Sequence, residues 1–213
     1  MTHSLSARQI WLISFLLCAA AASLSFAFLD LPVARWFSSH LGKLNPLATG
    51  LGSAVLLSLE ALIALALVAA RLVRGHLSPF AEALGLASLT SMCAYAVNDG
   101  VLKLFFGVPG PSGVLLEGAH HGFHLLAGAS DSSFPSGHMV LAASFGGVFM
   151  KLFPSSIWFL STALIFGAAL LIFGDWHFLS DVIVGAFAGV SAGILAGELW
   201  RVHSNRDTTQ GAA

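Results

Sequence analysis

The chain has 213 residues, of which 57% are hydrophobic and only 9% are Asp, Glu, Lys or Arg. Soluble domains carry about a quarter charged residues, so the composition excludes an ordinary soluble domain and indicates a compact integral-membrane bundle. The formal net charge of −1 gives no indication of a nucleic-acid partner. Cys18 and Cys93 each lie in an apolar run and are expected to be buried thiols rather than a disulfide or a metal pair.

Six apolar stretches are candidates for membrane-spanning helices. The first follows a short polar N-terminus, where a cleaved signal peptide is the competing interpretation, although the run is long for one. The fourth is short unless Pro135 to His138 belong to the same helix. The predicted spans of this single integral-membrane domain, residues 1-213, are about 10-29, 51-73, 80-106, 136-153, 157-173 and 178-200.

Residues 30–50, between the first two spans, are expected to form a loop with Trp36 and Phe37 at a membrane interface. Glu60 lies near the middle of the second span, where a charge is costly. A protonated or hydrogen-bonded packing role is the favoured interpretation of this residue. In the last span, glycines recur every four residues and permit close helix contact; they are Gly185, Gly189, Gly193 and Gly197.

The longest loop, residues 107–136, contains His120, His121 and His124. Long loops in compact proteins are usually functional or disordered. The histidines invite a zinc-site interpretation, but polar lining of the mouth of a site is favoured. No metal or cofactor is therefore expected.

The distribution of basic residues predicts the orientation. With six spans both termini lie on one side, together with Arg8, Arg71, Arg74, Lys151, Arg201 and Arg206, whereas the other side holds only Arg35, Lys43 and Lys103. The positive-inside rule makes the first side cytoplasmic. The long loop then faces outward, and a bacterial inner membrane with the site on the periplasmic side is the expected location.

The run Phe134-Pro135-Ser136-Gly137-His138 ends that loop and begins an apolar helix. The first turn of a helix presents backbone N–H groups without intrahelical partners, which makes it a site for anions. Gly137 lets a ligand approach the backbone closely. Lys103 is expected at the same membrane surface, where it would add a positive charge. It is four residues from Asp99, so the two side chains can also pair.

His177 and Asp181 are four residues apart at the start of the sixth span, so on a helix the carboxylate lies one turn from the ring. A carboxylate bonded to one imidazole nitrogen fixes the tautomer and leaves the other nitrogen as a nucleophile or base. His138, on the opposite side of the pocket, can protonate a leaving group. These parts predict phosphoryl transfer through a phosphohistidine.

The set Lys103, Pro135-Ser136-Gly137-His138 and His177-x-x-x-Asp181 resembles the type-2 phosphatidic acid phosphatase superfamily over about residues 98–197. The resemblance implies an all-α, six-span transmembrane helical bundle of the type shared with vanadium haloperoxidases. It implies that His177 is the nucleophile, Asp181 its orienting carboxylate and His138 the general acid. Lys103, Ser136 and Gly137 would bind phosphate.

Two arginines of the family motifs are missing. The motifs Lys-x6-Arg-Pro and Ser-Arg-x5-His-x3-Asp place arginines where this chain has Gly110 and Leu171. Each guanidinium would have offered bidentate, charge-assisted hydrogen bonds to phosphate. The candidates to replace them by location are His121 and His124, together with His120 and Arg35.

The expected function is that of an integral-membrane lipid phosphatase, with a phosphorylated membrane lipid as its partner and substrate. It would hydrolyse a phosphomonoester or a pyrophosphate. Two alternatives remain open. One is a transferase that moves a head group or phosphate between lipids, and the other is a catalytically weakened homologue that binds lipid.

Overall fold

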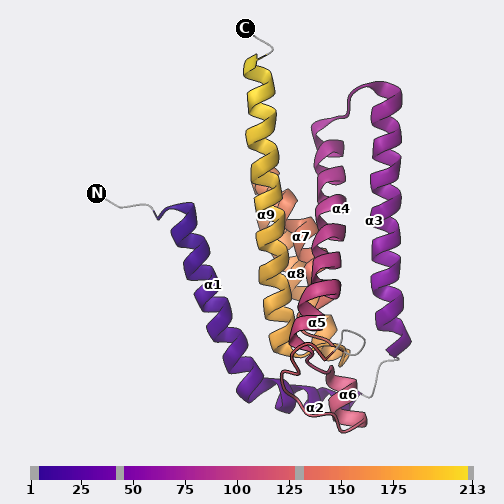
Figure 1. Cartoon of the computed structure of the whole chain (residues 1–213), viewed down its shortest axis with the longest axis vertical. Helices are drawn as coiled ribbons and strands as arrows, with labels where there is room; N and C mark the ends of the chain where they lie inside the picture. The colour runs from indigo at the N-terminus through magenta and orange to yellow at the C-terminus, as the bar shows by residue number, and fades with distance from the viewer. Residues whose placement is uncertain (1–4, 42–45, 128–131, 211–213) are drawn as a thin grey trace.

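The computed structural model describes residues 5–41, 46–127 and 132–210, and it shows a bundle of long helices with a cluster of short ones at one end (Figure 1). No β-strand occurs in these three segments, where an isolated β-bridge joins Pro109 and Ser132. The predicted all-α bundle is therefore confirmed.

The first helix, α1 (Ala7–Leu24), continues through a π-helical turn, η1 (Ser25–Leu29), into α2 (Asp30–Leu41). The expectation of a loop over residues 30–50 is wrong for most of that segment, because α2 is helical and α3 (Pro46–Arg74) begins before residue 50. Pro32 did not signal a helix, but it lies just after the π-helical turn, and prolines and π-helical turns are the usual places where a helix bends sharply. Helix α2 lies across the end of the bundle (Figure 1).

Helix α3 leads through a turn to α4 (Pro79–Val97), whose start is fixed by the Ser78 side chain and by proline at the first helical position. A second π-helical turn, η2 (Asn98–Leu102), joins α4 to α5 (Lys103–Phe106). Gly107, with φ of 58°, ends α5 in the left-handed conformation that glycine adopts without strain. The short helix α6 (Pro111–Leu116) follows.

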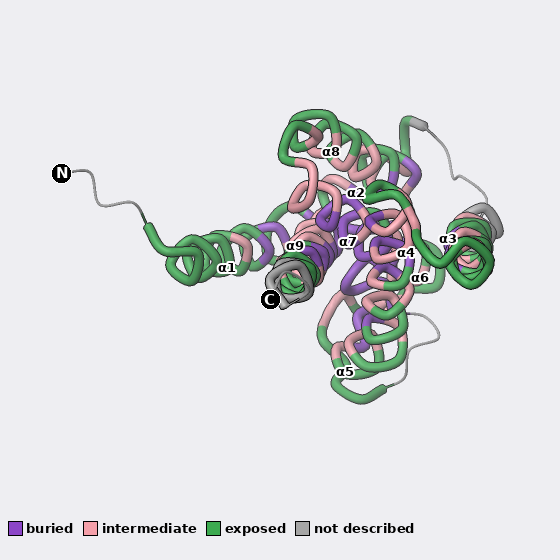
Figure 2. The backbone as a smooth tube through the Cα atoms, turned by 90° about the horizontal axis from the view of Figure 1, so that it is seen from above, coloured by how far each residue is buried: buried purple, intermediate pink, exposed green. Residues whose placement is uncertain are grey.

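The centre of the bundle is α7 (Gly137–Leu152), which has the largest fraction of buried residues (Figure 2). The chain returns through a 3₁₀ turn, η3 (Pro154–Ser156), to α8 (Ile157–Phe173) and then α9 (Leu179–Gln210). Helices α7 and α9 approach so closely that a methyl group at Gly189 would lie 2.8 Å from the Val140 carbonyl oxygen. The glycine stripe of the last span therefore serves packing within this chain.

Within the described segments, five helical stretches are long and apolar enough to cross a membrane, which makes this an integral membrane protein. They are Ala7–His40, Gly52–Arg74, Pro79–Phe106, Pro154–Phe173 and Leu179–Ser204. Helix α7 is apolar but only 16 residues long. Helix α1 begins and α9 ends on the side opposite α6 (Figure 1).

The side chains of the outer helices are largely exposed in the bundle, as expected where lipid is the solvent. Cys93 is exposed and Cys18 is half-buried, so the prediction of buried thiols is wrong for Cys93, although both are unpaired. Glu60 is buried and accepts a 2.9 Å hydrogen bond from Ser91 of α4. Lys43, counted in the charge argument, lies outside the described residues.

Candidate active site

A cavity of about 480 Å³ opens at the end of the bundle where α7 begins, within the size range of small-molecule sites, about 300–1,000 Å³. Four of the predicted site residues line it, although they are separated by up to 74 positions in the chain. The lining residues that carry the argument below are Ser53, Lys103, Gly110, Glu117, Gly137, His138, Trp176 and His177.

Helix α7 begins at the cavity wall. Its N-cap is Ser136, whose side chain is fully buried and accepts a hydrogen bond from the Met139 N–H at 3.4 Å. The carbonyl of Pro135 accepts a 3.1 Å hydrogen bond from Asn98 of η2. Ser136 therefore caps the helix and is not among the residues that line the cavity, whereas Gly137 in the first helical turn does line it.

His177 and Asp181 lie on one face at the start of α9, as the spacing predicts. The Nδ1 atom of His177 is 3.4 Å from Oδ2 of Asp181, and both side chains are buried. The same carboxylate oxygen accepts a 2.9 Å hydrogen bond from the Phe178 N–H. The contact fixes Nδ1 of the imidazole toward the carboxylate and directs Nε2 toward the cavity.

His138 lies directly beside His177 in the cavity lining. Its Nδ1 atom is 3.4 Å from Nε2 of His177, and its Nε2 atom is 2.9 Å from the hydroxyl oxygen of Ser53 on α3. Trp176 packs beside the ring, with centroids 6.3 Å apart. Ser53 was not anticipated from the sequence, because nothing in its local pattern indicates a contact with a residue 85 positions away.

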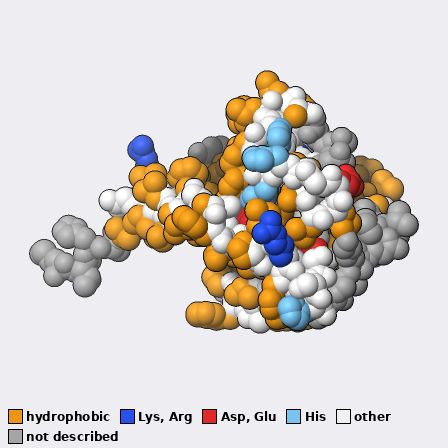
Figure 3. All heavy atoms as spheres, turned by 90° about the horizontal axis from the view of Figure 1, so that it is seen from below, with side chains coloured by type: hydrophobic (Ala, Val, Ile, Leu, Met, Phe, Trp, Pro, Cys, Tyr) orange, Lys and Arg blue, Asp and Glu red, His pale blue; other side chains and the backbone are white. Residues whose placement is uncertain are grey.

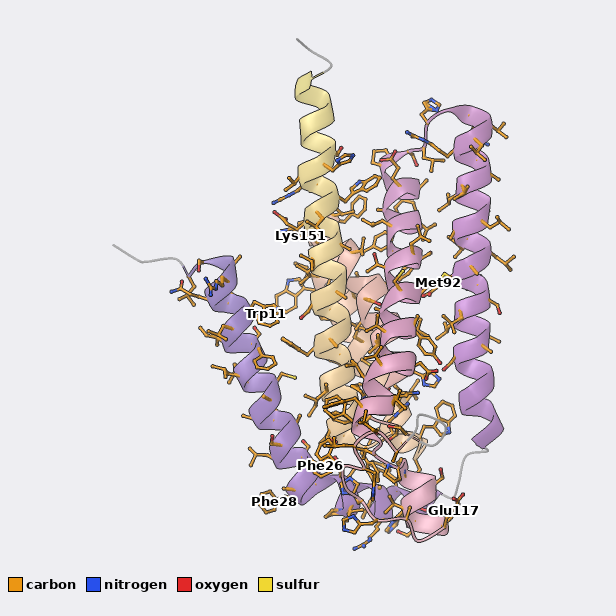
Figure 4. All side chains as sticks on the ribbon, viewed as in Figure 1. Trp11, Phe26, Phe28, Met92, Glu117 and Lys151 are labelled. Carbon is orange, nitrogen blue, oxygen red and sulfur yellow. The ribbon has the colours of Figure 1, made fainter. Side chains whose placement is uncertain are left out.

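The cavity has little positive charge. Lys103 is the one Lys or Arg among its described lining residues, and Asp99 pairs with it at 3.0 Å, as the spacing predicts. Glu117, at the end of α6, adds a carboxylate at the outer edge of the site (Figure 4). The end of the bundle seen from below shows only small areas of Lys and Arg on its surface (Figure 3).

The two motif positions without arginine have different surroundings. Gly110 lines the cavity and is the N-cap of α6, with an extended backbone that any residue adopts. Leu171 is buried in an apolar cluster with Met139 and Val182. An arginine at position 110 could therefore reach the cavity with little change in the backbone. An arginine at position 171 would instead place its charge in the apolar core.

His121 and His124 do not line the cavity. The side chain of His121 is 7% exposed, and its Nε2 atom lies 3.6 Å from Oδ2 of the buried Asp30. The Nε2 atom of His124 is 3.2 Å from the carbonyl oxygen of His120 in the same loop. Arg35 is exposed on α2 and also does not line the cavity.

The three loop histidines also form no metal-binding group. Within the described segments, no cluster of three or more His, Cys, Asp or Glu side chains has the arrangement needed to hold a metal ion. His120 and His124 lie with their ring centroids 6.1 Å apart. Among its described lining residues, the cavity itself offers two imidazoles, one ammonium group, the Glu117 carboxylate and the helix N-terminus at Gly137.

These features define an integral-membrane helical bundle with a histidine-containing cavity at one end. Residues 80–206, more than half of the chain, match the family model of the PAP2 superfamily. The chain therefore belongs to the PAP2 superfamily, which is generally a family of phosphatases, and the resemblance drawn from the motifs is confirmed. Searches of curated proteins and of solved structures each returned no match.

Proposed function

We propose that this membrane-embedded protein is a lipid phosphatase that works through a phosphohistidine on His177. The observation that supports this proposal is the convergence of His177, His138 and Lys103 on one cavity beside the start of α7. The site lies at an end of the bundle, where a phosphate group of a bilayer lipid can reach it while the acyl chains remain in the membrane.

In the first step, Nε2 of His177 attacks the phosphorus atom. The new P–N bond forms as the bond from phosphorus to the lipid oxygen breaks, and His138 donates a proton to that oxygen. In the second step, water attacks the phosphohistidine, His138 takes its proton, and the P–N bond breaks to release phosphate. Lys103 and the N–H groups at the start of α7 stabilise the negative charge on the phosphoryl oxygens.

The two rings are too close for this reaction in the conformation described. Only 3.4 Å separates Nε2 of His177 from Nδ1 of His138. An attacking nitrogen needs about 3–3.5 Å to the phosphorus alone, and the leaving oxygen lies beyond it. Entry of the phosphoryl group therefore requires the His138 ring to swing aside, which would change its hydrogen bond with Ser53.

The test is release of phosphate from a panel of phosphorylated lipids by the purified chain in mixed micelles. His177→Ala should abolish release and also abolish the acid-labile phosphoprotein captured by rapid quenching. The matched control is His76→Ala, since His76 is an exposed histidine in the turn between α3 and α4. Equal activity of the wild type and His177→Ala would refute the proposal.

The charge of the cavity favours a second candidate function, transfer of a phosphate-containing head group between lipids. One lysine, already paired with Asp99, and the carboxylate of Glu117 suit a singly charged phosphodiester better than a doubly charged phosphomonoester. The phosphohistidine intermediate is the same, and a lipid alcohol replaces water in the second step. Product analysis with diacylglycerol present distinguishes the two: a new phosphodiester lipid supports transfer, and free phosphate alone supports hydrolysis.

The distribution of basic residues supports a proposal for the orientation in the membrane. In the described segments Arg71, Arg74, Lys151 and Arg201 belong to the end of the bundle away from the cavity, as the label of Lys151 shows (Figure 4). We therefore propose that this end faces the cytoplasm and that the cavity faces the periplasmic or outer side of a bacterial inner membrane.

A further inference from the structure

A second carboxylate contacts the start of α9 from the side away from the cavity. Asp30, the first residue of α2, is 1% exposed. Its Oδ1 atom accepts a hydrogen bond from the Ser180 N–H at 3.0 Å, and its Oδ2 atom accepts one from the Ser180 hydroxyl at 2.5 Å. Two hydrogen bonds thus join residues that are 150 positions apart.

These bonds complete the first turn of α9. Ser180 is the second residue of that helix, so its N–H has no intrahelical acceptor. A buried N–H without a partner is costly, and a carboxylate at a helix N-terminus is stabilised by the helix dipole. Asp30 therefore caps α9 from a different helix, with full burial to strengthen the interaction.

The first turn of α9, which Asp30 caps, contacts two parts of the proposed site: His177 and the start of α7. Asp181 follows Ser180 directly and contacts His177 through Oδ2. The backbone carbonyl of Asp181 accepts a 3.1 Å hydrogen bond from the N–H of Ser136, the N-cap of α7. A shift of Ser180 would thus reach His177 through Asp181, and would reach the start of α7 through Ser136.

His121 lies beside the buried Asp30 carboxylate, with its Nε2 atom 3.6 Å from Oδ2. Its ring stacks on Phe26 with centroids 4.4 Å apart and meets Phe178 edge-on at 4.6 Å. Phe26 lies in η1, near the junction of the bundle and the end loops (Figure 4). A carboxylate–histidine pair therefore lies on each side of the start of α9: His177 with Asp181 toward the cavity, and His121 with Asp30 toward α2.

We propose that Asp30 is a positioning residue for the reaction of His177, acting through Ser180 and Asp181 and supported by His121. The role rests on the proposed function. Asp30 lies outside residues 80–206, the part of the chain that matches the family. The N-terminal helices would thus contribute to the geometry of the site as well as to membrane anchoring.

The experiment is rapid-quench analysis of the full chain in mixed micelles, with phosphatidic acid carrying a radiolabelled phosphate as the probe. The burst amplitude counts the molecules with an intact site, and the burst rate constant reports formation of the phosphohistidine. Asp30→Asn keeps the volume but turns one acceptor into a donor that faces the Ser180 donors. We expect a rate constant reduced by about 10- to 100-fold, the size expected for a displaced catalytic group, at an amplitude near that of the wild type.

Two milder variants keep the test decisive if Asp30→Asn fails to fold. Ser180→Ala removes only the hydroxyl donor, and we expect a rate reduced by about 2- to 10-fold. His121→Phe keeps the contacts with the two phenylalanines while removing the imidazole nitrogen beside Asp30, and it should also slow the burst. The control is Glu60→Gln, which changes a buried carboxyl that also accepts a serine hydrogen bond but lies between α3 and α4; its rate constant should equal that of the wild type.

The outcomes distinguish the positioning role of Asp30 from the proposed phosphatase function. Unchanged rate constants in Ser180→Ala and in a folded Asp30→Asn would overturn the positioning role, as would a loss of amplitude alone, which indicates a purely structural contribution. A wild-type chain that forms no His177-dependent phosphoprotein would instead overturn the proposed function, and the positioning role with it.

Discussion

Restoring a positive charge at position 110 tests whether the weakly charged cavity limits catalysis. Gly110 lines the cavity at a position where the motif resemblance predicts arginine. Its φ of −73° and ψ of 173° are open to any residue and suit a position before proline, here Pro111. Gly110→Arg should therefore leave the backbone in place.

The gain in transition-state stabilisation from Gly110→Arg can be estimated from the contacts of the new side chain. A β-carbon at position 110 would lie 3.3 Å from Cβ of Ser133, so Ser133 must move by only a few tenths of an ångström. Charge-assisted hydrogen bonds contribute about 1.5–3 kcal/mol each, and ordering an arginine side chain costs about 2 kcal/mol. The two hydrogen bonds of a bidentate contact with phosphate leave a net gain of about 1–4 kcal/mol, or about 5- to 900-fold in kcat/KM.

The assay is hydrolysis of phosphatidic acid in mixed micelles, with Gly110→Gln as the matched control because glutamine adds a long polar side chain without charge. Gly110→Arg should exceed both the control and the wild type in kcat/KM, and its advantage should shrink for a phosphodiester lipid. An arginine variant no more active than the glutamine variant would show that charge at this position does not limit the reaction.

Two further predictions concern charge and packing. Asp99→Asn removes the carboxylate that pairs with Lys103 at 3.0 Å, so the KM for phosphatidic acid should fall by about 3-fold at low salt, and a rise in KM would contradict the pairing argument. Gly193→Ala places a methyl group against the Ser144 carbonyl oxygen at the contact of α7 and α9 and should lower thermal stability in detergent by the equivalent of about 2 kcal/mol or more. Gly167→Ala, with open space around the new methyl group, should leave stability unchanged or slightly higher; equal losses in both variants would exclude close packing as the cause.

The positions of the long helices and the pairing of residues close in sequence could be predicted from local patterns. Hydrophobic length identifies the spans because the bilayer fixes how long an apolar helix must be. The spacing of four residues places Asp181 beside His177 and Asp99 beside Lys103, since those positions share a helix face. The glycine stripe of α9 follows from the same periodicity.

Local patterns misled where a residue's role depends on what packs against it. The segment 30–41 looked like a loop, yet it forms α2. Asp30 and Ala34 are buried against the bundle, and this packing stabilises the helix. Ser136 remains a predicted phosphate ligand, and only the structure shows that its side chain is also the N-cap of α7. His121 looked like the lining of a site mouth, and it instead contacts Asp30 behind α9.

The sequence by itself determined the membrane class, the family and the residues that carry the proposed chemistry, since these depend on composition and on short motifs. Only the tertiary structure decided what surrounds those residues: Ser53 beside His138, Asp30 beneath Ser180, and a cavity with Lys103 as its one described ammonium group. Such contacts join segments 85 or 150 residues apart. No periodicity encodes them, because they arise only when the helices pack and each buried polar group must find its partner.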